Sequence, residues 1–195
     1  MRQMFTHDVN LEKYDERPPC IKRIHHVAYR CKDAKETVDF YKEVLNMDLQ
    51  LVIAEDKVPS TKEPNPYVHV FLDAGMGNVL AFFELPNSPP MGKDPATPDW
   101  VQHIAFEVSF PQDFNEIKSR AESYGLEVLG PIDHAIFKSI YFFDPNGHRL
   151  EIAINTRTEE DIERLNSVAE EMLEEWSRTK KLPKQASWLH EKEFS

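Results

Sequence analysis

Ile24-His25-His26-Val27-Ala28-Tyr29 and Val101-Gln102-His103-Ile104-Ala105-Phe106 are two stretches of nearly the same pattern, and they decide the fold. Each places a histidine on a run of β-branched and aromatic residues, which is typical of a strand. Because strand side chains alternate between two faces, His26 shares a face with Ala28, and His103 shares a face with Ala105. The near-repetition predicts that the chain contains the same module twice.

A second matched pair of stretches brings one carboxylate to each half. Asn78-Val79-Leu80-Ala81-Phe82-Phe83-Glu84 and Gly147-His148-Arg149-Leu150-Glu151-Ile152-Ala153 each place a glutamate on an apolar strand. A buried carboxylate is costly unless it is paired or coordinates a metal. The two histidines and two glutamates therefore predict a metal site made of His26, Glu84, His103 and Glu151. His25 is one residue out of phase with His26 and should point away from that site.

Each histidine strand is followed by a helix and three further strands. In the first half we expect strands at about 22–30, 48–54, 67–73 and 78–85, with a helix that begins near Asp33 and ends at Asn46. In the second half a strand at about 101–109 precedes a helix from Asp113 to Gly125, and strand-like segments follow. Asn and Gly are both common helix stops because they tolerate the left-handed backbone conformation. Asp144-Pro145-Asn146-Gly147 is predicted to be a turn between the last two strands.

These patterns divide the chain into five segments. We expect an N-terminal arm (1–19), a first βαβββ module (20–85), a linker (86–99), a second βαβββ module (100–155) and a C-terminal helical extension (156–195). The linker is rich in proline, which regular elements exclude. Thr158-Glu159-Glu160-Asp161 is similar to a capping box and predicts a helix to about residue 178. That helix could pack on its own module, contact a dimer partner or cover the site.

Composition narrows the class of ligand. The 195 residues include 34 acidic and 23 basic ones, a formal net charge of −11, which disfavours nucleic acid or an anionic membrane as partner. A hydrophobic content of 41% suffices for a core, but no run is long enough for a membrane span and no leader is evident. We therefore predict a cytoplasmic protein that binds a small molecule. Cys20 and Cys31 are expected to be reduced thiols.

The doubled pattern resembles the vicinal oxygen chelate superfamily. The resemblance rests on His26-Val27-Ala28 and His103-Ile104-Ala105, on Asp39-Phe40-Tyr41, and on Asp144-Pro145-Asn146-Gly147 before Glu151, and it covers about residues 22–154. This group includes glyoxalase I, bleomycin-resistance proteins, extradiol ring-cleaving dioxygenases, fosfomycin-resistance enzymes and methylmalonyl-CoA epimerase. It implies an α+β fold in which two tandem βαβββ modules form an incomplete barrel around one divalent metal, with the C-terminal helix outside the resemblance.

Within that superfamily, the stretch from Ile132 to Glu151 resembles the signature of the extradiol dioxygenases, because it contains His134, Tyr141 and the terminal glutamate at matching spacings. This resemblance implies a metal triad of His26, His103 and Glu151 that holds Fe(II) and takes an aromatic diol and dioxygen. His134 would be the acid–base residue and Tyr141 a hydrogen-bond donor. Zn, Ni, Co or Mn would suit the same ligands, and no organic cofactor is implied.

Two other functions stay open on the sequence. Extradiol enzymes usually lack a carboxylate at the position of Glu84, so a glyoxalase-like isomerase or lyase with four metal ligands is the first alternative, and Glu84 could be a ligand, a base or a bystander. Asn78 stands where many extradiol enzymes carry a histidine, and His69 on the preceding strand is a candidate substitute. The second alternative is a bleomycin-resistance-type binding protein without a metal. The two modules could pair within one chain or across a homodimer.

Overall fold

The computed structural model describes residues 21–185 and 187–188 of the chain. The expected N-terminal arm, residues 1–19, and Cys20 lie outside the described residues. The elements, in chain order, are β1 (Val27–Cys31), α1 (Ala34–Leu45), β2 (Leu49–Lys57), β3 (Pro64–Asp73), β4 (Val79–Glu84), β5 (His103–Val108), α2 (Pro111–Ser123), β6 (Leu129–Asp133), β7 (Phe137–Phe143), β8 (Arg149–Asn155) and α3 (Glu159–Thr179).

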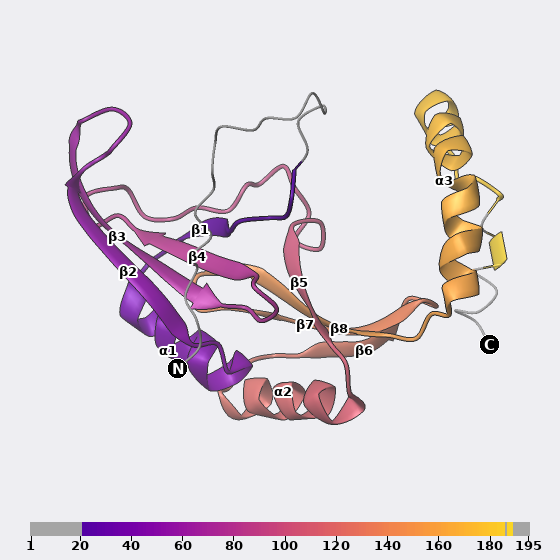
Figure 1. The fold of residues 1–195 in the computed structure, drawn as a ribbon, viewed down its shortest axis with the longest axis horizontal. Helices are drawn as coiled ribbons and strands as arrows, with labels where there is room; N and C mark the ends of the chain where they lie inside the picture. Colours follow the sequence, from indigo (N-terminus) through magenta and orange to yellow (C-terminus); the bar gives the residue numbers. More distant parts are fainter. Residues whose placement is uncertain (1–20, 186, 189–195) are drawn as a thin grey trace, which may run out of the picture.

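The eight strands form two sheets of identical topology. Sheet A has the order β1-β4-β3-β2, and sheet B has the order β5-β8-β7-β6. In each, the first strand pairs in parallel with the fourth, and the remaining pairs are antiparallel. Both sheets are open and not closed into barrels (Figure 1). The predicted α+β fold of two tandem βαβββ modules with a C-terminal helix is confirmed.

The ends of α1 are set by two residues that the sequence singles out. Asp33 is the N-cap, and its side chain accepts a hydrogen bond from the Glu36 amide. Asn46 closes the helix in the left-handed conformation, with φ of 55°. In the second module, α2 begins at Pro111 and so starts before the predicted Asp113, because proline suits the first turn of a helix.

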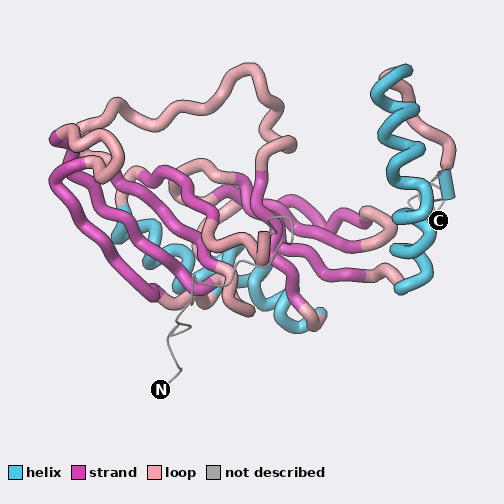
Figure 2. Tube along the Cα trace, turned by 45° about the horizontal axis from the view of Figure 1, so that its top comes forward, coloured by secondary structure: helices cyan, strands magenta, loops and turns pink. Residues whose placement is uncertain are grey.

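The helices α1 and α2 lie on one side of the two sheets (Figure 2). Alternate side chains of the central strands are buried toward them, such as Leu80 and Phe82 on β4 and Leu150 and Ile152 on β8. These residues belong to one hydrophobic core that extends through both modules. The intervening residues therefore lie on the other face of each sheet, which carries no helix of its own module.

The Asp144–Gly147 turn does more than connect two strands, because it also joins the modules. The Asn146 Oδ1 accepts a hydrogen bond from the Lys32 amide at 2.8 Å, and its Nδ2 donates to the Thr37 hydroxyl at 3.1 Å. The Tyr41 hydroxyl donates to the Asp144 carboxylate at 3.2 Å. Asp144, Asn146, Thr37 and Tyr41 are all buried. The turn of the second module is thus bound to the helix of the first.

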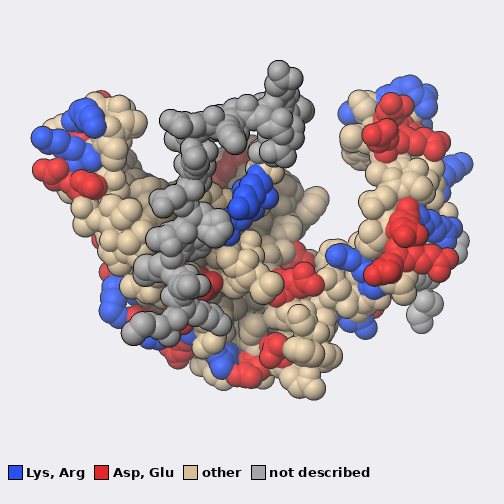
Figure 3. Space-filling model, in the orientation of Figure 1, with Lys and Arg blue, Asp and Glu red and all other residues tan. Residues whose placement is uncertain are grey.

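The C-terminal helix α3 stands apart from both sheets, and the described surface is hollowed between them (Figure 3). The predicted capping box is present, since Thr158 and Asp161 exchange side-chain and backbone hydrogen bonds. No residue of α3 is buried, and Leu173 and Trp176 are exposed. Packing on its own module, one of the roles expected for this helix, is not what the structure shows. None of the described helices combines the length and apolar character needed to cross a membrane.

Candidate functional site

Strand register shows which residues of the two modules are equivalent. In sheet B, His103 pairs with Arg149 and Ala105 pairs with Glu151. In sheet A, Val27 pairs with Leu80 and Ala28 pairs with Ala81. Superposing the two ladders makes His26 the equivalent of His103, as predicted, and makes Ala81 the equivalent of Glu151.

Glu84 lies three residues beyond that position and on the opposite face of β4. It pairs with Cys31, which is buried on the helix side of sheet A. The Glu84 Oε2 accepts a hydrogen bond from the Ala34 amide at 2.7 Å, at the first turn of α1. A carboxylate at a helix N-terminus is stabilised by the exposed amides and the helix dipole. The structure therefore places Glu84 apart from the other three predicted metal ligands.

The second module brings four of the predicted residues together on the open face of sheet B. The His103 Nε2 lies 2.9 Å from the Glu151 Oε2, and the Glu151 residue is only 3% exposed. Tyr141 pairs with Glu151 across the β7–β8 ladder. The Tyr141 hydroxyl is hydrogen-bonded to the His134 Nε2 at 2.9 Å. His103, Glu151, Tyr141 and His134 thus form one continuous polar cluster.

Ser139 completes this cluster and was not singled out from the sequence. Its hydroxyl donates to the Glu151 Oε1, while His103 occupies the other carboxylate oxygen. Strand alternation is the sequence signal that could have identified it. Ser139 lies two residues before Tyr141 and so shares a strand face with it. The contact holds the Glu151 carboxylate in one orientation.

Burial has a chemical consequence at Tyr141. Desolvation, reinforced by the nearby Glu151 carboxylate, raises the pKa of the Tyr141 phenol above its usual 10.0. The phenol therefore keeps its proton throughout the neutral range. It is suited to donate a hydrogen bond.

The first module places His26 just before β1 on the open face of sheet A. Its ring centroid lies 6.1 Å from that of His69 and 5.8 Å from that of Phe71. The expectation that His25 points away from the metal site stays a prediction, and its Nδ1 lies 2.8 Å from the His26 Nδ1. Strand alternation does not apply to this pair because β1 begins only at Val27.

The surroundings of His69 differ from those of Asn78, which stands where many extradiol enzymes carry a further histidine. His69 is buried and stacks on Phe83 with ring centroids 3.6 Å apart, and its Nε2 has no hydrogen-bond partner within the described chain. Burial and the nearby His26 lower the pKa of His69 below its usual 6.5. Asn78 instead lies in the turn before β4, where its side chain donates to the Gly75 carbonyl.

The described part of one chain does not bring all the predicted metal donors together. Within residues 21–185 and 187–188, no group of three or more His, Cys, Asp or Glu side chains is arranged to hold a metal ion. Two of the predicted donors, His103 and Glu151, are nevertheless neighbours, and the buried carboxylate is anchored by Ser139. Imidazole nitrogen and carboxylate oxygen are ligands for divalent transition metals, so these residues fit such an ion. His26 holds the equivalent position on the other sheet.

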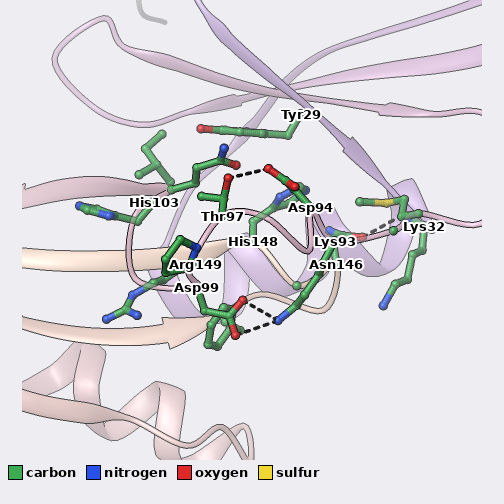
Figure 4. A pocket seen from close by; sticks show the side chains of 17 residues that line it. Tyr29, Lys32, Lys93, Asp94, Thr97, Asp99, His103, Asn146, His148 and Arg149 are labelled. Atoms are coloured by element: carbon green, nitrogen blue, oxygen red, sulfur yellow. Dashed lines mark hydrogen bonds and ion pairs between the residues drawn. The ribbon is translucent and has the colours of Figure 1, made fainter.

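A cavity of about 440 Å³ adjoins this cluster where the modules meet the linker. His103 and Arg149 line one side, and Tyr29, Lys93 and Asp99 line others (Figure 4). The Arg149 guanidinium lies over the Tyr141 ring, 4.4 Å from the ring centroid. The cavity therefore gives a small molecule access to the edge of the polar cluster.

Comparison with known proteins gives a family match and one relative named for an activity. A family model described as Glyoxalase/Bleomycin resistance protein/Dioxygenase superfamily matches residues 23–152. The chain is 30% identical over 133 residues to the Bacillus subtilis (strain 168) protein named "Putative ring-cleaving dioxygenase MhqA". The match covers 67% of this chain and 39% of that relative, so the chain spans about two fifths of its length.

Solved structures share the fold. A glyoxylase/bleomycin resistance protein/dioxygenase domain from Frankia sp. EAN1pec has a TM-score of 0.55 at 17% identity, covering 70% of this chain and 99% of that one. A glyoxalase family protein from Enterococcus faecalis has a TM-score of 0.50 at 26% identity, with coverages of 68% and 97%. A mutant of the fosfomycin resistance protein FosX from Listeria monocytogenes, complexed with Mn(II) and 1S,2S-dihydroxypropylphosphonic acid, has a TM-score of 0.51 at 19% identity, with coverages of 73% and 98%.

Proposed function

We propose that this chain, which belongs to the Glyoxalase/Bleomycin resistance protein/Dioxygenase superfamily, is a metal-dependent dioxygenase that cleaves the ring of an aromatic diol. The observation that carries the proposal is the continuous cluster of His103, Glu151, Tyr141 and His134. It combines metal donors, a protonated hydrogen-bond donor and an acid–base group on one sheet face. The similarity to a relative named as a ring-cleaving dioxygenase supports the same reaction.

In this proposal His26, His103 and Glu151 hold one divalent metal, with Fe(II) as the ion. Two histidines and one carboxylate are the donor set of non-haem Fe(II) oxygenases, which leaves coordination positions for substrates. The FosX protein of the same fold forms a complex with Mn(II), which supports a divalent ion here. Zn, Ni, Co or Mn would be accepted by the same donors, and elemental analysis distinguishes them. When bound, an Fe(II) ion would supply coordination positions for the diol and dioxygen and would pass electrons between them.

The protein residues supply the proton chemistry. His134 accepts a proton from a substrate hydroxyl, because imidazole is the side chain that most often acts as a general base in enzymes. Tyr141, hydrogen-bonded to His134 and kept protonated by burial, donates a hydrogen bond to negative charge that develops on oxygen. Ser139 fixes the Glu151 carboxylate. In the overall reaction both atoms of dioxygen enter the ring-opened product.

The placement of Glu84 favours a dioxygenase over a glyoxalase-like isomerase or lyase. An isomerase or lyase of that type needs a second carboxylate at the metal, from the first module. The equivalent of Glu151 there is Ala81, and Glu84 faces the N-terminus of α1. A binding protein without a metal is disfavoured because the buried Glu151 carboxylate is held beside His103, an arrangement of oxygen and imidazole donors that suits a metal ion.

The proposal includes a second copy of the chain, which completes the metal site. His26 and the pair of His103 and Glu151 lie on open sheet faces that a single copy does not gather into one metal centre among its described residues. Apolar side chains are exposed on β2, where Leu51 and Val52 are each 50% exposed, and on α3 at Leu173. In a C2 homodimer, sheet A of each copy would face sheet B of the other copy, which gives two equivalent sites. The same contact would bury this apolar surface.

Oxygen uptake tests the function. Protein purified without oxygen would be analysed for metal, and oxygen consumption would then be followed with catechol and substituted catechols. We expect close to one iron per site, with uptake that is lost in His134→Ala and kept in the matched control Glu84→Gln. Zinc, nickel or cobalt in the protein, together with no uptake after loading with Fe(II), would rule the dioxygenase out.

A further inference from the structure

Arg149 occupies a position beside the metal donors that the proposed reaction does not use. It lies on β8 two residues before Glu151, and so shares its strand face. It pairs with His103 in the parallel β5–β8 ladder. In Figure 4 the His103 ring and the Arg149 guanidinium extend to the same side, away from the linker residues Asp94 and Asp99.

The guanidinium has no anionic partner within the described chain. The Arg149 Nε is buried and makes no hydrogen bond with the described residues, and the guanidinium instead lies over the Tyr141 ring. The carboxylate on the same strand face belongs to Glu151, and each of its two oxygens already has a partner, His103 for one and Ser139 for the other. The Arg149 residue as a whole is half-buried, so its buried Nε is the donor that still lacks an acceptor and that an entering anion would satisfy.

Other charged groups around the cavity have partners of their own. The Asp94 carboxylate accepts hydrogen bonds from a hydroxyl and an amide of the linker. The Asp99 carboxylate lies 3.4 Å from the Lys93 ammonium. The Lys32 ammonium donates to a backbone carbonyl at 3.0 Å. Arg149 is therefore the cation at this cavity that the described residues leave without an oxygen acceptor.

We propose that Arg149 binds a carboxylate carried by the substrate ring. Guanidinium is a planar fork that binds carboxylate through two hydrogen bonds, and stacking on Tyr141 holds that fork in one orientation. Arg149 is displaced from Glu151 by two strand residues, roughly 6.6 Å along the backbone, so it would reach a group other than the two metal-binding oxygens. The inference rests on the proposed function and names its substrate class, a carboxylated aromatic diol.

The test compares 3,4-dihydroxybenzoate with catechol, which lacks the carboxylate. Arg149→Met should raise the KM for 3,4-dihydroxybenzoate by about 10- to 100-fold, since a charged hydrogen-bonded pair is lost, while the KM for catechol changes little. Arg149→Lys should recover part of the loss. The matched control is Arg120→Met, which removes an arginine of α2 that is already paired with Glu116 and lies outside the cavity, and it should leave both KM values nearly unchanged. Metal content is measured in each variant, so that a change in iron is not mistaken for a change in binding.

Binding without turnover separates this inference from the proposed function. Affinities for 3,4-dihydroxybenzoate and catechol would be measured calorimetrically on the same proteins under argon. If binding prefers the carboxylated ligand, this preference depends on Arg149 and no oxygen is consumed, then the anion-binding role of Arg149 is supported and the dioxygenase proposal is overturned. Normal oxygen uptake with equal weakening of both ligands in Arg149→Met, or no preference in the unaltered protein, would overturn the anion site and leave the dioxygenase.

Discussion

At the scale of single residues, Glu84 and Glu151 illustrate how strand parity separates two carboxylates with similar sequence surroundings. Each follows an apolar strand segment. Glu151 shares a face with Tyr141 and His103, whereas Glu84 shares a face with the buried Cys31. The first is held by Ser139 at the candidate metal centre, and the second accepts the amide of Ala34 at the start of α1.

Substitution of the two glutamates by glutamine should have opposite consequences. Glu151→Gln removes a charged donor, and we expect the metal dissociation constant to rise at least about tenfold. Glu84→Gln should keep the metal affinity but destabilise the protein by about 0.5–1 kcal/mol, because the helix N-terminus loses its negative charge. Equilibrium dialysis and urea unfolding measure the two effects. Equal loss of metal in both variants would contradict this assignment.

Tyr141 is expected to act through its hydroxyl. Tyr141→Phe keeps the ring under Arg149 but removes the hydrogen-bond donor, so kcat should fall by about 100-fold with little change in KM. Because burial raises the pKa of the phenol, the activity that depends on its proton should persist until the pH exceeds 10.0. Steady-state oxygen uptake, followed from neutral pH to the onset of unfolding, checks both points. A kcat unchanged in the phenylalanine variant would remove Tyr141 from the reaction.

Cys31 makes stability depend on alkaline pH. Burial raises the pKa of the Cys31 thiol from 9.0 to about 11. Between these values the unfolded chain releases the proton and the folded chain keeps it, so the free energy of unfolding falls as the pH rises through this window. In Cys20→Ser protein, a thiol reagent at neutral pH should react with Cys31 only as fast as the chain unfolds. Immediate reaction in the native state would show that the thiol is accessible.

At the scale of elements, the Asp144–Gly147 turn is the part of β7–β8 that holds the modules together. The Asn146 side chain is hydrogen-bonded to the Lys32 amide, which precedes α1, and to the Thr37 hydroxyl, which lies within α1. Asn146 and Thr37 are both buried. The motif thus has a tertiary role in addition to its local one. The same turn begins the strand that carries Arg149 and Glu151, so its attachment to the first module also positions the candidate site.

Asn146→Ala should therefore destabilise the whole protein. The substitution leaves the Lys32 amide and the Thr37 hydroxyl without this partner, and the expected loss is about 1–3 kcal/mol. Asn155→Ala is the matched control, since Asn155 donates to Glu107 on the exposed sheet surface and should cost less than about 0.5 kcal/mol. Urea denaturation followed by circular dichroism compares them. Similar losses in both variants would show that the turn does not bear on module attachment.

At the scale of the whole molecule, the separation of His26 from His103 and Glu151 predicts that activity requires two chains. Inactive His26→Ala and inactive Glu151→Gln proteins, mixed, unfolded and refolded together, should form heterodimers in which one of the two sites keeps all its ligands. Random pairing gives roughly a quarter of the wild-type activity. Light scattering would follow the dimer. A dimer with no recovered activity would mean that each site uses residues of one chain.

Much of this protein is determined by its sequence alone. The alternation of apolar residues, the helix ends at Asp33 and Asn46, and the repeated histidine stretches specify two βαβββ modules, because these signals are local and act within a few residues. Alternation along a strand likewise determines which of its own residues share a face, as it does for Arg149 and Glu151. The C-terminal helix follows from its capping box in the same way.

The tertiary structure decided what local patterns do not contain. Whether Glu84 faces a metal or a helix depended on a three-residue offset in strand pairing, and the role of Asn146 depended on residues more than 100 positions away. The unpaired charge of Arg149 became visible only when the occupied oxygens of its neighbours were known. Each of these features depends on contacts between segments that are distant in sequence. The local sequence determines which face of its strand a side chain lies on, whereas the pairing of distant segments determines what surrounds that side chain.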